Sequence, residues 1–495
     1  MKPLKIVSIS SELDPFSKTG GLADVSRSLA RSLHRLGHDV IAITPLYSKM
    51  IDREKHKLEK IYSDVKLEID KENTVTVSYY RGELMPGLPV YFMRCDKYFG
   101  RKKWPYLSSR EGARFYLFNI AALKLISLLK FKADVIHCHD WQTGLIPYLK
   151  KKRFHSSKTL AHAATVFTIH NLTFQAGMNW WEIPVKKRDK GKSALPMFKD
   201  EKTNYINFSK RAILNADIIN TVSETYADEI IKKNFGQDLH RILVNRKHKL
   251  FGVVNGIDYH RYNPKTDKEI KKKYSIDNIH RKIVNKRHLQ KTLKLPVDDR
   301  IPVIGFTSRI AEQKGFDLLL DILPTLLLRD VQFVIMGDGD KGLIERINKM
   351  KKKFPGKIHQ FPFYENRKME SLVYAGGDFL LLPSRFEPCG TTQMIAFRYG
   401  CVPIVRSTGG LSDTVDNFDP MDYKKGNGFT FKNYRSQELL VAVTRALETY
   451  KYKDVWKDLM RRGMRASFSW ELPAKKYLEL YKKAKKFKYE KDKLG

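Results

Sequence analysis

A glutamate in the second half of the chain lies between an expected strand and an expected helix. Glu387 follows the apolar run 378–382, which has strand character, and precedes residues 391–399, which have helical spacing and end at Gly400. A helix start offers free backbone N–H groups and a positive dipole end, which suit a phosphate. A carboxylate beside it can bind sugar hydroxyls. The segment 383–393 is therefore typical of a sugar- and phosphate-binding site.

Two glycines near the amino end form a second candidate anion site. Gly20 and Gly21 lie where a loop becomes a helix whose apolar stripe runs from Leu22 to Leu36. Glycine lets backbone N–H groups approach an anion, and Lys18 adds a full positive charge. The alternative is an ordinary glycine-rich turn with a surface lysine, which the two glycines alone favour by about two to one.

A third site follows the expected strand 301–308. Arg309 and Lys314 lie on the loop that leaves this strand, just before Gly315. An arginine fork and a lysine point charge are what a departing diphosphate needs, because negative charge accumulates on it as its bond to the sugar breaks. Either residue alone is explained as one of 92 lysines and arginines. Their shared position favours the diphosphate-binding role.

Histidines end two expected strands of the first half. His137 and His139 alternate with Cys138, and His170 ends the next strand, so a metal site comes to mind. No further ligand is spaced to complete a closed set, and we put a metal at about one in ten. Polar groups at the carboxyl ends of parallel strands more often bind substrate hydroxyls.

Cys389, beside Glu387, could be read as a nucleophile. A nucleophilic thiol needs a base and a lowered pKa, and no histidine lies nearby in the sequence. A packing or substrate-lining role is favoured about fourfold.

Length and composition predict two domains without a membrane anchor. The chain has 495 residues, 42% of them hydrophobic, and no apolar run approaches the roughly 18 residues of a membrane span. The amino end leads into a strand without a signal pattern. Four cysteines have neither paired nor metal-type spacing, which fits a reducing compartment. We expect a cytoplasmic protein.

The net charge is unusual, at +38. Such a field attracts polyanions, so nucleic-acid binding is a candidate function. The lysines occur in short dispersed runs, however, and no nucleic-acid-binding pattern accompanies them. A lysine-biased proteome is favoured over a nucleic-acid function by about three to one.

Strands alternate with amphipathic helices along both halves of the chain. Expected strands lie at 5–10, 39–44, 135–139, 165–170 and 217–222, and again at 301–308, 331–336, 378–382 and 401–405. The pattern predicts two Rossmann-like, doubly wound parallel sheets of the α/β class, facing across a cleft. We place the domains at 1–256 and 257–470, with a terminal amphipathic helix from 471 to 495.

These segments together resemble the glycogen and starch synthase family of retaining glucosyltransferases. The resemblance covers nearly the whole chain. The matching segments are 18–25, 137–141, 168–171, 221–223, 255–258, 307–315, 337–340, 383–393, 402–406, 408–411 and 468–470. It implies the GT-B fold, a terminal helix crossing back to the first domain, and transfer of glucose from ADP-glucose to the non-reducing end of an α-1,4-glucan such as glycogen or starch. It also implies no metal and no other cofactor. The dispersed lysines and the lack of a membrane-length apolar run predict neither a nucleic-acid nor a membrane partner.

The resemblance assigns roles by position. Arg309 and Lys314 match the residues that hold the diphosphate, and Glu387 and His170 match those that bind the glucose. Asp140 matches the aspartate near the reacting sugar. Further donor-site positions are Lys18, Gly20, Gly21, Asp24, Tyr364, Cys389, Gly390, Thr391 and Thr392. His139 and Trp141 are placed on the acceptor side, with packing an equal alternative for Trp141.

Three departures and two alternative functions remain. Tyr262 stands where the family usually has tryptophan, Thr391 stands where it has an apolar residue, and the segment around Tyr364, the expected base-stacking residue, is about two residues out of step.

Ala23, in the run of residues 20–24, makes this run more similar to that of bacterial glycogen synthases than to that of plant starch synthases. This similarity favours ADP-glucose as the glucose donor. The alternatives are a UDP-glucose-dependent enzyme of the same fold and a catalytically silent glucan-binding protein.

Overall fold

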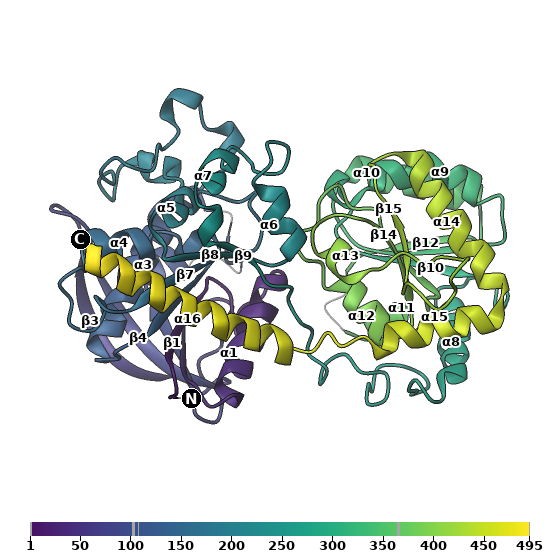
Figure 1. Ribbon diagram of the computed structural model, residues 1–495, viewed down its shortest axis with the longest axis horizontal. Coiled ribbons are helices and arrows are strands. Elements are labelled where there is room, and N and C mark those ends of the chain that lie inside the picture. The colour runs from purple at the N-terminus through teal and green to yellow at the C-terminus, as the bar shows by residue number, and fades with distance from the viewer. Residues whose placement is uncertain (1, 101–103, 107, 364–366, 495) are drawn as a thin grey trace. The chain divides into compact units, whose positions relative to one another are not determined.

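The computed structural model describes residues 2–100, 104–106, 108–363 and 367–494. The chain forms two compact units, one of Met1–Val253 with Trp470–Gly495 and the other of Val254–Ser469 (Figure 1). The last segment of the chain thus belongs to the first unit. The chain passes between the units close to the expected boundaries at 256 and 470.

The first unit is built on a mixed sheet. In its described part the strand order is β3-β4-β5-β2-β1-β6-β7-β8-β9. The strands are β1 (Lys5–Ile9), β2 (Asp39–Pro45), β3 (Glu59–Glu68), β4 (Thr74–Met85), β5 (Leu88–Arg94), β6 (Val135–His139), β7 (Ala164–Ile169), β8 (Ile218–Thr221) and β9 (Leu250–Gly252). From β5 to β9 all neighbours are parallel, as the alternating pattern predicts. The antiparallel β3-β4-β5 edge is a correction to the expected all-parallel sheet.

Helices cover both faces of this sheet. They are α1 (Gly21–Arg35), α2 (Asp96–Phe99), α3 (Glu111–Leu128), α4 (Ile146–Lys152), α5 (Phe208–Asn215), α6 (Glu224–Ile230), α7 (His240–Val244) and α16 (Glu471–Leu494). Residues of α3, α4 and α5 pack in one core cluster, and residues of α1 and α16 pack against the strands in another. Figure 1 shows α16 running along the same unit as α1. The sheet is therefore buried on both sides, and every residue of β6, β7 and β8 is buried, polar side chains such as His137 and Thr168 included.

A chain of hydrogen bonds joins α16 to three central strands. Thr168 donates to the Asn220 Oδ1 atom at 2.8 Å, so its hydroxyl hydrogen is used. The Nε2 atom of His137, 2.6 Å from the Thr168 hydroxyl, must then be the donor in that contact. His137 Nδ1 is left as the acceptor for Tyr481 of α16, at 2.9 Å. The terminal helix is thereby tied to β6, β7 and β8 through one defined tautomer of His137.

The second unit has a fully parallel sheet in its described part, with order β12-β11-β10-β13-β14-β15. The strands are β10 (Val303–Thr307), β11 (Gln332–Met336), β12 (Ile358–Phe361), β13 (Phe379–Leu382), β14 (Val402–Arg406) and β15 (Phe429–Phe431). The order reverses between β10 and β13. In doubly wound sheets ligands bind outside the carboxyl ends of the strands at such a point.

The helices of the second unit also lie on both faces of its sheet. They are α8 (Lys282–Thr292), α9 (Phe316–Leu326), α10 (Lys341–Lys353), α11 (Arg367–Gly376), α12 (Thr392–Arg398), α13 (Gly409–Thr414), α14 (Ser436–Lys451) and α15 (Lys453–Arg465). Residues of α9, α10, α14 and α15 form one core cluster with the strands, and residues of α8 and α11 form another. Within the described ranges of the chain, no helix combines the length and apolar character needed to cross a bilayer.

A buried ion pair ties α8 to the start of β13. Lys286 Nζ lies 2.8 Å from Asp378 Oδ2, with side chains only 2% and 9% exposed. Lys286 also donates to the Tyr450 hydroxyl and to the Asp299 carbonyl oxygen, and Asp378 accepts from the backbone N–H of Val303. Every charge in this cluster is thus matched by hydrogen bonds.

Removing one partner of this pair should be costly. Because Asp378→Ala leaves the Lys286 ammonium buried and uncompensated, we expect a loss of about 3–5 kcal/mol in the stability of the second unit, measured by urea unfolding. The matched control is Glu345→Ala, which breaks the Lys349 pair on α10, where both side chains are more than 65% exposed. That variant should lose less than about 1 kcal/mol. Equal losses in the two variants would contradict the prediction.

Candidate active site

Two loops of the second unit meet through an ion pair. Lys314, the last residue of a 3-10 turn at Glu312–Lys314, follows β10, and Glu387 follows β13. Lys314 Nζ lies 2.5 Å from Glu387 Oε2, with side chains 17% and 12% exposed. The sequence predicted a phosphate role for the lysine and a sugar role for the glutamate. The structure brings the two groups into direct contact.

Close backbone packing holds these two loops together. Gly315 has φ +79°, and a Cβ atom there would lie 2.1 Å from the Pro383 carbonyl oxygen. At Gly409 a Cβ atom would lie 1.9 Å from the carbonyl oxygen of Glu387. Only glycine fits at either position, because any side chain would overlap the backbone. The spacing between the β10, β13 and β14 exits is therefore set by backbone contact.

Two residues that the sequence did not single out complete this arrangement. Ser384 Oγ donates to Glu387 Oε2 at 3.2 Å. Arg406, at the end of β14, is 8% exposed and donates through Nε to the Ser384 carbonyl oxygen at 2.8 Å and through Nη2 to that of Arg385. Arg406 thus binds the loop that carries Glu387. The sequence signals for it were its place at the carboxyl end of a buried strand and within the matching segment 402–406, but neither gave it a role.

The turn after Glu387 is also held from within. Gln393 donates from Nε2 to the Gly390 carbonyl oxygen at 2.8 Å and to the Thr414 hydroxyl at 3.1 Å. Gly390 has φ +67°. The helix that follows begins at Thr392, with Thr391 as its N-cap, and ends at Arg398, one residue short of the expected 391–399 at each end.

Burial decides the chemistry of Cys389. Its side chain is enclosed, and desolvation, the largest cause, raises the pKa of the thiol to about 12. A thiol of this kind is protonated at neutral pH and is a poor nucleophile. The packing or lining role, rather than a nucleophilic one, is the role consistent with this environment.

Arg309 lies on the same strand exit as Lys314. It is exposed, and its Nη2 atom contacts Gln313 Oε1 at 3.4 Å. The second unit therefore places an exposed guanidinium, a half-buried ammonium and a carboxylate along two adjacent strand exits. Such a set can bind a diphosphate through its cations and a hydroxyl through its carboxylate.

In the first unit, His137 and His139 lie on β6, and His170 directly follows β7. The Nδ1 atom of His139 lies 3.1 Å from Nε2 of His170, and its Nε2 lies 3.3 Å from the Ser8 hydroxyl. Burial lowers the pKa of His137 and of His170 to about 3, and that of His139 well below its ordinary value. All three are neutral imidazoles at neutral pH.

Asp140 links the ends of these two strands. Its backbone has φ +58°, uncommon for a residue other than glycine. Its Oδ1 atom accepts the backbone N–H of His170 at 2.8 Å, and its own N–H donates to the Thr168 carbonyl oxygen. Burial raises the pKa of the Asp140 carboxyl to about 7, although the backbone N–H groups of His170 and Asn171 oppose that rise. Asp140 thus holds the turn on which His170 lies.

Trp141 and His139 are enclosed rather than surface groups. Trp141 is 6% exposed and packs edge-on against Phe115 and Phe208, with ring centroids 5.2 and 5.5 Å away. This environment fits the packing alternative for Trp141. His139 has no exposed surface, so in this structure it contacts its neighbours on β1 and β7.

Glu12 binds the glycine-rich loop before α1 through hydrogen bonds to Thr19. This carboxylate, 2% exposed, accepts the backbone N–H and the hydroxyl of Thr19 and the hydroxyl of Tyr106. The sequence alone does not point to Glu12, because nothing in the local pattern shows that it faces the loop. Lys18 pairs with Asp24 at 2.7 Å, both partly exposed.

Gly20 and Gly21 are not required by the backbone of the protein itself. Gly20 has an extended φ of −159°, and a Cβ atom at either glycine would meet nothing within 4 Å. A turn that needed glycine would show a positive φ or a close neighbour. The open space above them is instead what a bound anion would need.

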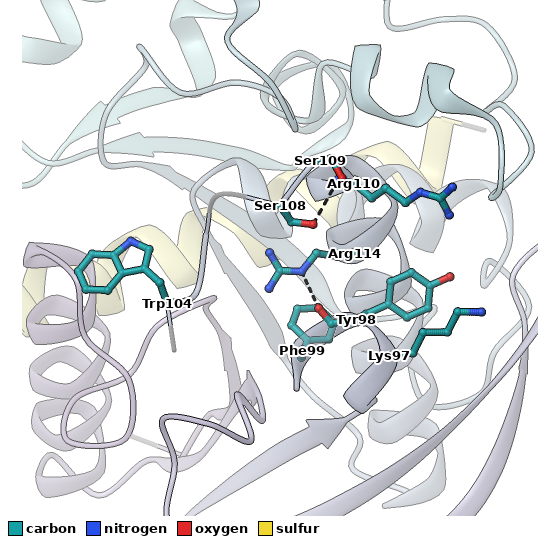
Figure 2. Close-up of a pocket in the computed structure, with 8 residues that line it drawn as sticks. All are labelled: Lys97, Tyr98, Phe99, Trp104, Ser108, Ser109, Arg110 and Arg114. Atoms are coloured by element: carbon teal, nitrogen blue, oxygen red, sulfur yellow. Dashed lines mark hydrogen bonds between the residues drawn. The ribbon is translucent and has the colours of Figure 1, made fainter. Parts of the chain in front are cut away.

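A separate pocket of about 340 Å³ lies beside α2 and the start of α3 (Figure 2). Arg114 donates through Nε to the Tyr98 carbonyl oxygen at 2.7 Å and pairs with Glu111. The lining residues are Lys97, Tyr98, Phe99, Trp104, Ser108, Ser109, Arg110 and Arg114. The pocket combines cations with aromatic rings, and no sequence pattern had pointed to it.

Two expectations concern groups that bind ligands directly. Among the described residues, no group of three or more His, Cys, Asp and Glu side chains is arranged to hold a metal ion. Tyr364, the predicted base-stacking residue, lies outside the described residues.

Comparisons with known proteins point to one family. Residues 5–245 match the family described as the starch synthase catalytic domain, and residues 290–462 match glycosyl transferases group 1. Glycogen synthase of Geotalea daltonii is 40% identical over 97% of this chain and 98% of its own, and that of Anoxybacillus flavithermus is 37% identical over 97% of each. The catalytic domain of starch synthase IV from Arabidopsis thaliana, solved with ADP and acarbose, has a TM-score of 0.85 at 32% identity and covers 98% of this chain and 100% of its own. The chain has the GT-B fold and belongs to the glycogen and starch synthase family of glycosyltransferases.

Proposed function

We propose that this protein is a glycogen synthase that transfers glucose from ADP-glucose to the non-reducing end of an α-1,4-glucan with retention of configuration. The observation that carries the proposal is the contact between Lys314 and Glu387, because it places a cation for phosphate and a carboxylate for sugar hydroxyls at adjacent strand exits. The ADP in the related starch synthase structure supports an adenine nucleotide as the carrier.

The second unit supplies the groups for the leaving diphosphate. Arg309 and Lys314 neutralise the charge that builds up on it, and the backbone N–H groups of Thr391 and Thr392 assist at the start of α12. Glu387 binds glucose hydroxyls once the diphosphate attracts Lys314. Ser384 and Arg406 keep Glu387 in place during this exchange.

The first unit supplies neutral and acidic groups for the sugar. His170 binds the glucose, Asp140 supports His170 through its backbone N–H, and Lys18 with Gly20 and Gly21 contributes to donor binding.

The reaction needs no thiolate nucleophile. Cys389 of the second unit supplies none, because burial raises the pKa of its thiol. The acceptor hydroxyl attacks the anomeric carbon as the bond to the diphosphate breaks, and its proton passes to a phosphate oxygen. Excluding water then prevents hydrolysis of the donor.

The proposal requires no metal ion, other cofactor or nucleic-acid partner, and it assigns the reaction to the cytoplasm. The four free, buried cysteines support a reducing compartment. Activity in the presence of a strong chelator tests the first of these points.

The donor can be identified directly by following radiolabelled glucose into glycogen. We expect incorporation from ADP-glucose with EDTA present, and a near-complete loss in Glu387→Ala, because the carboxylate that binds the sugar is gone. A preference for UDP-glucose would overturn the donor and keep the reaction. Binding of glycogen without incorporation from either donor would instead support a catalytically silent glucan-binding protein.

Lys314 should act chiefly on the chemical step. Because its charge is needed most as the diphosphate departs, Lys314→Met should lower kcat about 100-fold to 1,000-fold, measured under saturating donor. The matched control is Lys341→Met, an exposed lysine at the start of α10. A fall in the control as large as that in Lys314→Met would show that only general charge matters.

Asp140 should give the activity a pH dependence. A carboxyl with a pKa of about 7 is protonated below neutrality, and the protonated form accepts the His170 N–H more weakly and carries no charge. We therefore expect kcat/KM to rise as the pH increases through 7. Asp140→Asn keeps an accepting oxygen but does not titrate, so its profile should be flat in this range. A step at pH 7 that persists in this variant would exclude Asp140 as its cause.

A further inference from the structure

Ser8, His139 and His170 form a row of hydrogen bonds from β1 to the end of β7. The Ser8 hydroxyl lies 3.3 Å from His139 Nε2, and His139 Nδ1 lies 3.1 Å from His170 Nε2. Both rings are neutral, because burial lowers their pKa values far below neutrality. Each ring therefore carries one N–H, which leaves two ways to direct the bonds along the row.

The two arrangements differ at the far end of the row. In the first, Ser8 donates to His139, His139 Nδ1–H donates to His170 Nε2, and His170 carries its hydrogen on Nδ1. In the second, every bond runs the other way, and His170 Nδ1 is bare. The ring nitrogen that His170 leaves for a ligand is thus a donor in the first arrangement and an acceptor in the second.

Counting the donors distinguishes the two. Ser8 is 6% exposed, and within the described part of the chain its hydroxyl has no recorded partner other than His139. In the second arrangement the Ser8 hydroxyl hydrogen would be buried without an acceptor, which is costly. In the first arrangement that hydrogen is used, and only a spare lone pair of Ser8 goes without a partner. The first arrangement is therefore the stable one.

We propose that Ser8 and His139 are positioning residues that fix His170 as its Nδ1–H tautomer, so that His170 presents a hydrogen-bond donor to a hydroxyl oxygen of the donor sugar. The proposal rests on the proposed function for the identity of the sugar, but the tautomer does not depend on it. His170 is partly exposed, and its Nδ1 atom has no recorded partner among the described residues.

The neighbouring His137 is independent of this row. Its ring lies 4.0 Å from that of His139, centroid to centroid, but its two nitrogens bond to Thr168 and Tyr481. His137 is therefore held as the Nε2–H tautomer, opposite to the one proposed for His139 and His170. Adjacent histidines of one strand would thus carry their hydrogens on different ring nitrogens.

The tautomers can be measured without any activity. In protein labelled with ¹⁵N-histidine, two-bond ¹H–¹⁵N correlations identify the protonated nitrogen of each ring, and the signals of His139 and His170 are assigned by their loss in single His→Asn variants. We expect Nδ1–H for His139 and His170, and Nε2–H for His137. A His170 ring protonated on Nε2 would overturn the proposal.

A substitution series at position 139 gives the kinetic test. The amide nitrogen of Asn takes nearly the place of Nδ1 and can donate, Asp places an acceptor there, and Leu makes no bond. With ADP-glucose, we expect His139→Asn to keep most of the wild-type kcat/KM, and His139→Leu and His139→Asp to lose about tenfold to 100-fold. If the Asp variant were active and the Asn variant inactive, His170 would need the opposite tautomer.

Deoxy analogues of ADP-glucose separate positioning from a merely structural effect. Wild-type protein should prefer ADP-glucose over the analogue that lacks the hydroxyl bound by His170. In His139→Leu this preference should disappear, because His170 no longer presents its donor to that hydroxyl. Tyr481→Phe, which removes a buried hydrogen bond from His137 instead, is the matched control and should keep the wild-type discrimination. Full discrimination in His139→Leu would overturn the proposal. Failure of wild-type protein to use ADP-glucose would count against the proposed function and leave the tautomer measurement standing.

Discussion

The ion pair between Lys314 and Glu387 is the interaction around which the second unit organises its site. Lys314 leaves β10 and Glu387 leaves β13, the two strands between which the sheet order reverses. Gly315 lets the β10 loop approach the backbone of Pro383 in the β13 loop, and Gly409 lets the β14 loop approach the backbone of Glu387, because glycine has no Cβ atom. The pair also keeps both charges matched while the side chains are only 17% and 12% exposed, until a diphosphate attracts Lys314.

In the first unit, polar side chains lie inside a sheet that is buried on both faces. Three histidines, two on β6 and one directly after β7, are neutral because desolvation makes their charged forms unfavourable. As neutral rings they each offer one donor and one acceptor. His137 and His139 contact hydroxyls on β1, β7 and α16, and His170 contacts His139. Polar order at the strand ends is therefore a consequence of burial, and it reaches as far as the terminal helix.

The alternation of buried strands and amphipathic helices allowed the central strands of both sheets to be predicted, because strands covered on both faces are mostly apolar. Within the described residues, six strands were not predicted, namely β3, β4, β5, β9, β12 and β15. The strands β3 and β4 mix polar and apolar residues, and β9 and β15 are only three residues long. In the site, Lys314 and Glu387 stood out through their place at strand exits. Ser384, Arg406 and Glu12 did not, because their hydrogen bonds form only when a loop folds back on itself or meets a neighbouring strand exit.

By itself, the sequence determined that the chain makes two doubly wound units, which residues follow the carboxyl ends of their strands, and which family the chain resembles. Those properties depend on local periodicity and on motifs, both of which are written along the chain. Tertiary structure alone decided that Lys314 meets Glu387, that Asp140 holds the turn of His170, and which tautomer His137 adopts. Such properties depend on burial and on donors and acceptors from separate strands, and no local pattern records them.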